Sequence, residues 1–112
     1  MKIYIIQPSY PKTMDERKNT VDFILESLDS VSSDADLILL PEFSNIPGAS
    51  DYNQMLADYD QNTQALTDKV IATAKRTNAM VAVNMAYRTE TGFRNSTLLY
   101  DNNGSLKYRY DK

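Results

Sequence analysis

Glu42 is the first residue of this sequence whose type and place could do chemistry. It follows the apolar run Leu37–Leu40 and Pro41, so it lies just beyond the carboxyl end of a predicted strand, where functional groups collect in open α/β sheets. Such a place partly desolvates a carboxyl group, which raises its pKa and makes it a better general base near neutral pH. The position alone leaves open a second interpretation, an ordinary surface glutamate after a strand.

Lys112 is the second candidate. From Leu106 to Tyr110 apolar and basic residues alternate, so one face of this predicted strand is apolar and the other is basic. Lys112 has the parity of the apolar face. If the strand continues, its ammonium group points inward and needs an anionic partner or a role. The alternative is a frayed terminal lysine. Asn84, inside another apolar run, is interpreted as a core amide with satisfied hydrogen bonds.

Hydrophobic patterns predict the elements that position these residues. Thr13 and Glu16 have the spacing of a capping box, and the apolar residues behind them recur at i, i+3, i+4 and i+7, as on one face of a helix. The run Leu37–Leu40 is too short for a helix and does not alternate, so it predicts a strand buried on both faces. Asn103 and Gly104 form a strong hairpin signal. The predicted strands cover residues 2–7, 35–41, 80–88, 95–100 and 105–110, and the predicted helices cover 14–30 and 52–77, with a break near 61–63 left open because the apolar stripe weakens there.

This order of elements predicts an α/β fold. Strand–helix–strand alternation implies parallel neighbouring strands with helices that cover the sheet, and the last two strands pair as a hairpin. With 112 residues, of which 42% are hydrophobic and 24% are charged, the chain has the length and composition of one small globular domain.

Composition excludes several classes of function. The sequence has no cysteine and no histidine, which removes disulfides, the usual zinc sites, Ser-His-Asp triads and Cys-His dyads. Its three glycines lie far apart, so a nucleotide-binding half-domain with a glycine-rich loop is disfavoured. A net charge of −3 argues against a dedicated nucleic-acid binder. No apolar run is long enough to cross a membrane, and the N-terminal run is too short for a signal peptide. We therefore expect a cytoplasmic protein without a metal or cofactor.

Four segments together resemble the carbon–nitrogen hydrolases, the nitrilase superfamily. Ala35–Phe43 resembles the family's glutamate motif, an apolar strand followed by Pro-Glu. The opening strand ends in Gln-Pro, as in many members. Arg94–Tyr100 resembles the strand with the pattern Tyr/Arg-Asn-Ser/Thr. Gly104–Lys112, with Tyr110 two residues before the lysine, matches the segment that carries the catalytic lysine. The segments occur in the family's order and span essentially the whole chain.

The resemblance implies a four-layer αββα sandwich and a Glu-Lys-Cys triad. By resemblance, Glu42 is the general base and Lys112 stabilises the tetrahedral oxyanion. A cysteine thiolate attacks the amide or nitrile carbon, and water hydrolyses the resulting thioester. Amides are favoured over nitriles by analogy with the family's broader group.

The sequence also departs from the family pattern. It ends at Lys112, whereas the family's cysteine and the second glutamate of many members lie downstream, and Asp111 stands where Arg is common. We therefore expect residues 1–112 to be the N-terminal portion of a single hydrolase domain, inactive alone. The expected partners are a small amide or nitrile substrate and further copies of the chain in a homo-oligomer, with neither nucleic acid nor membrane. The alternative is a non-catalytic α/β binding or interaction module.

Overall fold

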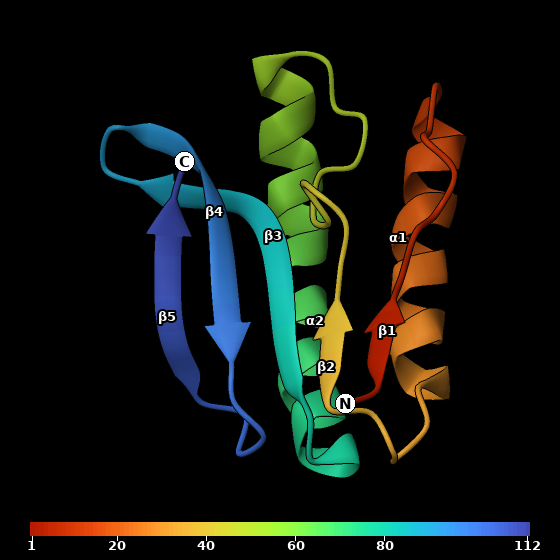
Figure 1. Ribbon diagram of the computed structural model, residues 1–112. Coiled ribbons are helices and arrows are strands. Elements are labelled where there is room, and N and C mark those ends of the chain that lie inside the picture. Colours follow the sequence, from red (N-terminus) through yellow and green to blue (C-terminus); the bar gives the residue numbers. More distant parts are fainter.

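A computed structural model describes residues 1–112 and shows one five-stranded sheet with both helices behind it (Figure 1). The strand order β1-β2-β3-β4-β5 follows the chain. Neighbours are parallel from β1 to β3 and antiparallel from β3 to β5, so the predicted α/β class and element order are confirmed. The elements are β1 (Ile3–Ile5), α1 (Met14–Ser30), β2 (Leu37–Leu39), α2 (Tyr52–Thr77), β3 (Met80–Thr89), β4 (Gly92–Tyr100) and β5 (Leu106–Asp111).

The helices begin and end where the sequence predicts, but α2 is not broken near residues 61–63. The apolar stripe weakens there because Asn62 and Thr63 form hydrogen bonds with Asn45, a fully buried polar residue. Asn62 Nδ2 donates to the Asn45 carbonyl at 3.0 Å, and Asn45 Nδ2 donates to Thr63 Oγ1 at 3.0 Å. The polar residues therefore replace apolar contacts without interrupting the helix.

The strands differ from the prediction mainly at their ends. β1 and β2 are shorter than expected, at three residues each. β4 begins at Gly92, three residues earlier than predicted. Because Thr89 pairs with Gly92, β3 and β4 form a hairpin of their own around Glu90 and Thr91, a turn that lacks the Asn-Gly signal of the β4–β5 connection.

The core lies between the sheet and the two helices. Ile38 of β2 is fully buried there, whereas Leu37 and Leu39 on the opposite face are only partly buried. The prediction that this strand is buried on both faces is therefore wrong, because no second layer covers the other side of the sheet. Fully buried apolar residues from both layers make up the centre of the core: Ile24, Leu28, Ile38, Leu66, Val70, Val81 and Val83.

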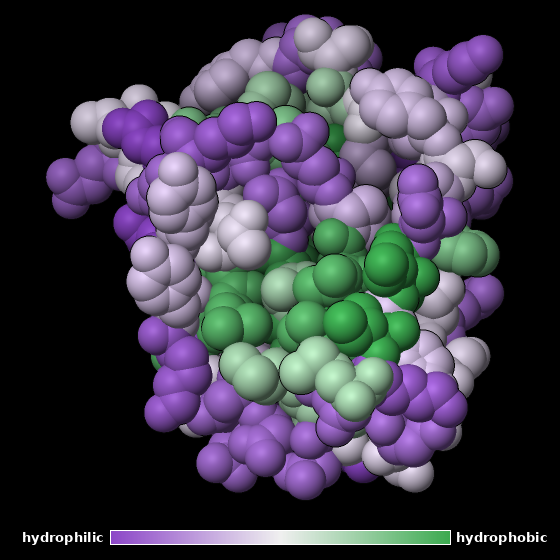
Figure 2. Space-filling model, in the orientation of Figure 1, coloured by the Kyte–Doolittle hydropathy of each residue, from purple (hydrophilic) through white to green (hydrophobic).

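We call the uncovered side of the sheet the open face. The pairing register places one stripe of side chains from every strand on it: Ile3, Ile5, Leu37, Leu39, Met80, Ala82, Leu99, Tyr108 and Tyr110. Figure 2 looks onto this face and shows a continuous hydrophobic patch in its centre. Ile5 and Tyr108 remain 68% and 61% exposed. No helix of the chain is both long and apolar enough to span a membrane.

Candidate functional site

A sharp elbow after β2 presents Glu42. The next residue, Phe43, has a φ of +54°, a left-handed conformation that costs a bulky residue roughly 1–3 kcal/mol and persists only where its surroundings hold it. Two hydrogen bonds tie the elbow to Asn84 of β3: the Phe43 N–H donates to Asn84 Oδ1 at 2.8 Å, and the Ser44 N–H donates to the Asn84 carbonyl at 2.9 Å. Ser44 Oγ also donates to the Pro41 carbonyl at 2.6 Å.

Lys112 lies on the open face, close to Glu42. Its N–H donates to the Asn95 carbonyl at 2.8 Å, so the β4–β5 ladder extends past Asp111 and Lys112 keeps the predicted parity. Lys112 Nζ lies 4.0 Å from Glu42 Oε2. The structure thus brings together the two residues that the sequence singles out.

The expected burial of these two groups is not found. The Glu42 side chain is 61% exposed and the Lys112 side chain is 74% exposed. Both predictions, a partly desolvated carboxylate and an inward-pointing ammonium, are wrong for this chain because the face that carries them has no covering layer.

Asn95 and Asn84 belong to the site, although the sequence patterns do not assign them to it. Asn95 Nδ2 donates to Glu42 Oε2 at 3.1 Å, and Asn84 Nδ2 donates to Asn95 Oδ1 at 2.7 Å and to Thr97 Oγ1 at 3.1 Å. The amide of Asn84 has its hydrogen bonds, as predicted, but the prediction that it lies in the core is wrong, because Asn84 is half-buried on the open face. Asn84 is signalled only as a polar residue inside an apolar strand, and Asn95 only as the Asn of the Arg-Asn-Ser segment. The register that pairs β3 with β4 is needed to interpret both signals.

Asp111 anchors the end of β5 beside Lys112. It faces the helix side of the sheet, where Ser96 Oγ donates to its Oδ1 at 2.6 Å and Arg109 lies 3.1 Å from its Oδ2. The hydrogen bond from Ser96, with a smaller contribution from the Arg109 charge, lowers the pKa of Asp111. The contacts of the ionised Asp111 therefore fix the end of β5, and with it the position of the next residue, Lys112.

A cavity of about 650 Å³ opens beside Glu42, between the loop of residues 7–11 and the loop of residues 41–49. The two loops touch at Gly48, where a Cβ atom would lie 2.7 Å from Pro11 Cγ. The cavity has a size suited to a small molecule. Its lining includes Gln7, Tyr10, Glu42, Phe43, Ile46 and Met55.

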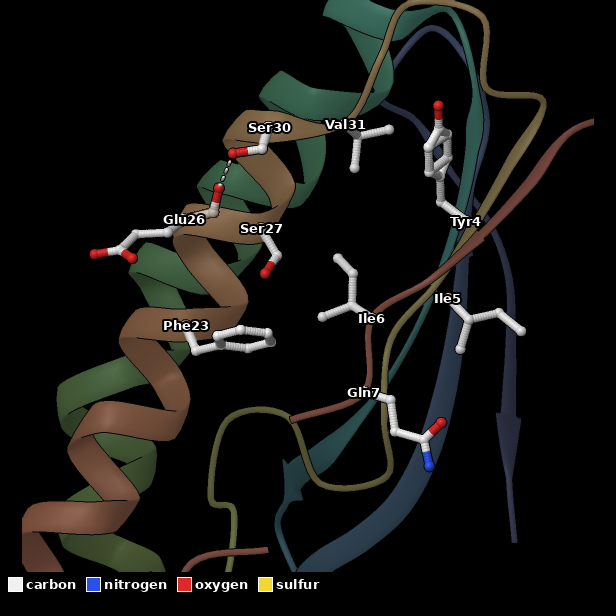
Figure 3. Close-up of a pocket in the computed structure, with 9 residues that line it drawn as sticks. All are labelled: Tyr4, Ile5, Ile6, Gln7, Phe23, Glu26, Ser27, Ser30 and Val31. Carbon is white, nitrogen blue, oxygen red and sulfur yellow. Dashed lines mark hydrogen bonds between the residues drawn. The ribbon is translucent and has the colours of Figure 1, made fainter. Parts of the chain in front are cut away.

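A second cavity, of about 530 Å³, lies between β1 and α1 and contains neither candidate residue. In Figure 3, Phe23 and Ser27 of α1, together with Val31 directly after the helix, face Ile6 across this space, while Ile5 points away from the helix. The chain has no group of three or more acidic, His or Cys side chains arranged to hold a metal ion. Of these two cavities, the one beside Glu42 is lined by a candidate site residue.

Solved structures with a similar fold come from several organisms. The NitFhit protein of C. elegans has a TM-score of 0.70 at 16% identity, over 98% of this chain and 27% of that one. A glutamate-to-glutamine variant of an amidase from Nesterenkonia sp. AN1, with acrylamide added at the active-site cysteine, has a TM-score of 0.69 at 18% identity, over 100% and 44%. A CN-hydrolase superfamily protein from Xanthomonas campestris, with an arsenic adduct in the active site, has a TM-score of 0.61 at 26% identity, over 86% and 35%.

The chain thus spans less than half the length of each of these structures, and its two helices and five-stranded sheet match a nitrilase-like fold over essentially the whole chain. No curated protein matches the sequence. The sequence model of the family described as Carbon-nitrogen hydrolase matches residues 2–112, nearly the entire chain. This protein therefore belongs to the carbon–nitrogen hydrolase family.

Proposed function

We propose that this chain supplies the general base and the oxyanion-stabilising cation of an amidase-type active site. The observation that carries the proposal is the convergence of Glu42 and Lys112, whose Oε2 and Nζ atoms lie 4.0 Å apart beside the cavity. In this proposal residues 1–112 are the N-terminal portion of a single hydrolase domain. The nucleophilic cysteine, absent from this sequence, belongs to the remainder of that domain.

The proposed reaction begins when the Glu42 carboxylate accepts the cysteine thiol proton. The thiolate attacks the amide carbon, and the carbonyl electron pair moves onto oxygen as an oxyanion beside the Lys112 ammonium. When the intermediate collapses, the C–N bond breaks and the amine leaves with the proton from Glu42. Glu42 then accepts a proton from water, which attacks the thioester, releases the carboxylic acid and restores the thiol.

A small amide is the proposed substrate. The similar amidase that holds acrylamide at its active-site cysteine supports this class, and the cavity beside Glu42 has room for such a molecule. A homo-oligomeric state and a cytoplasmic location stay predictions.

The test is to sequence the reading frame beyond codon 112, express the complete frame and measure ammonia release from acrylamide. We expect the frame to encode a cysteine and the product to hydrolyse the amide, and we expect Glu42→Gln to abolish turnover. Glu90→Gln, in the exposed β3–β4 turn, is the matched control and should keep wild-type turnover. A stop codon after Lys112, with a stable product, would instead favour the non-catalytic interaction module.

A further inference from the structure

A continuous chain of hydrogen bonds joins the elbow at Phe43 to the carboxylate of Glu42 by way of two asparagine side chains. The Phe43 N–H donates to Asn84 Oδ1 at 2.8 Å, Asn84 Nδ2 donates to Asn95 Oδ1 at 2.7 Å, and Asn95 Nδ2 donates to Glu42 Oε2 at 3.1 Å. The chain begins and ends at neighbouring residues, so it forms a closed loop around the elbow.

This loop has one direction. A backbone N–H can only donate, so Phe43 fixes the Asn84 amide with its oxygen toward the elbow and its nitrogen toward Asn95. Asn95 must then present its oxygen to Asn84 and its nitrogen to Glu42. The end of the chain therefore offers a donor to the Glu42 carboxylate, whose oxygens accept hydrogen bonds.

We propose that Asn84 is a positioning residue for Glu42, which orients the Asn95 amide so that it donates to the carboxylate and which holds the left-handed elbow at Phe43. The proposal rests on the proposed function only in that it takes Glu42 to be a general base, a role that needs the carboxylate form. The Asn84 side chain makes no hydrogen bond to Glu42; its partners are Phe43, Asn95 and Thr97, so it acts on Glu42 through its neighbours.

Thr97 provides a matched control for this role. Its Oγ1 accepts the second N–H of Asn84 at 3.1 Å, on the same face of the neighbouring strand, but it lies outside the chain that ends at Glu42. Thr97→Val removes one hydrogen bond of Asn84 without changing the direction of the loop. A merely structural role of Asn84 predicts similar effects for both positions, whereas a positioning role separates them.

The test follows the asparagine side-chain amides of the 112-residue protein in ¹H–¹⁵N NMR spectra during an acid titration. Protonation turns the Glu42 carboxyl into a partial donor and weakens the bond from Asn95, so the Asn95 and Asn84 signals should move together as the pH falls. Glu42→Gln should abolish this movement. Asn84→Leu should abolish it for Asn95, and Thr97→Val should keep it.

If the Asn95 side-chain signal still moves during the acid titration of a folded Asn84→Leu variant, the proposal is wrong. If the backbone spectrum shows that Asn84→Leu has lost its fold, Asn84→Ala takes its place. The wild-type spectrum is a test that needs no variant, because an Asn84 signal indifferent to the Glu42 titration also contradicts the proposal. The NMR test does not measure turnover. If the Asn84 and Asn95 signals move together as proposed but the complete enzyme is inactive, that result contradicts the proposed function and leaves the role of Asn84 intact.

Discussion

The Glu42 and Lys112 side chains are mostly exposed and contribute little to the core. Substitutions at these positions should therefore affect the proposed reaction much more than the stability of the fold. In the complete enzyme, Lys112→Ala should lower kcat by about 10²–10⁴-fold, the range of a lost acid–base or oxyanion contribution. In the 112-residue chain, where the Lys112 side chain is 74% exposed, the same substitution should change the free energy of unfolding by less than about 0.5 kcal/mol. Steady-state kinetics and urea unfolding measure the two effects.

The double variant Glu42→Gln with Lys112→Ala tests whether the two residues act as a unit. Groups that serve one chemical step are not additive, so the double variant should turn over little more slowly than the slower single variant. A kcat reduced by the product of the two single effects would show independent roles. In that case the 4.0 Å approach of Lys112 Nζ to Glu42 Oε2 would not reflect a shared site.

At the scale of elements, a buried ion pair joins the two helices. Arg17 Nε donates to Asp58 Oδ2 at 2.9 Å, and the side chains are only 9% and 12% exposed. Asp58→Ala leaves the Arg17 charge buried without a partner and should lower the free energy of unfolding by about 3–5 kcal/mol. Urea unfolding measures the loss.

The exposed pair Lys69–Asp29 is the control, since it also links α1 and α2. Asp29→Ala should cost no more than about 1 kcal/mol, as for other surface ion pairs. The double variant Arg17→Met with Asp58→Leu should recover most of the loss, because it leaves no buried charge. Equal losses for Asp58→Ala and Asp29→Ala would contradict this account of the buried pair.

Asp34 ties the start of β1 to the loop before β2. Hydrogen bonds, first from Lys2 and then from Ser32 and Tyr4, lower the pKa of Asp34 from 3.8 to about 2. Because the folded-state pKa is the lower one, the carboxylate stabilises the fold above pH 3.8, and this contribution is lost as the pH falls toward 2. Asp34→Asn should therefore flatten the pH dependence of unfolding in this window. Asp60→Asn, an exposed change on α2, should leave that dependence unchanged.

Local signals predict the helices better than the strand ends. The Thr13 capping box marks the start of α1 because the cap is made by residues three apart, and both of its hydrogen bonds form. The start of β4 depends on cross-strand pairing, so the sequence patterns place it three residues too late. The unbroken α2 likewise depends on a distant partner, Asn45.

The sequence predicts those site residues whose place follows from the order and alternation of residues in a strand. Glu42 stands out by its place after a strand, and the alternation in β5 assigns Lys112 to the correct face. Asn95 and Asn84 could not be assigned to the site, because their roles depend on the register of β3 against β4 and on the elbow at Phe43. The exposure of both charged groups could not be predicted either, because it depends on what covers the sheet.

At the scale of the whole molecule, the open face is the side of the sheet that neither helix covers. One helix layer and one sheet are present, and the αββα sandwich that the family resemblance implies would place a second sheet against the uncovered side. The exposed stripe includes Ile5 and Tyr108, and Figure 2 shows that the patch is continuous. A soluble chain seldom leaves an apolar surface of this kind free, because contact with another apolar surface removes it from water.

The 112-residue chain should therefore self-associate through the open face. Light scattering coupled to size-exclusion chromatography should show a mass that rises with protein concentration. Ile5→Lys together with Leu39→Lys places two charges on the open face, where an association would have to bury them, and should shift the protein to a monomer. Phe23→Lys, on an exposed residue of α1 away from that face, should leave the association unchanged. If Phe23→Lys disrupts it equally, the contact does not use the open face.

If the wild-type chain stays monomeric at high concentration, residues 1–112 are stable without a covering layer. That result favours the interaction module over a portion of a larger hydrolase domain.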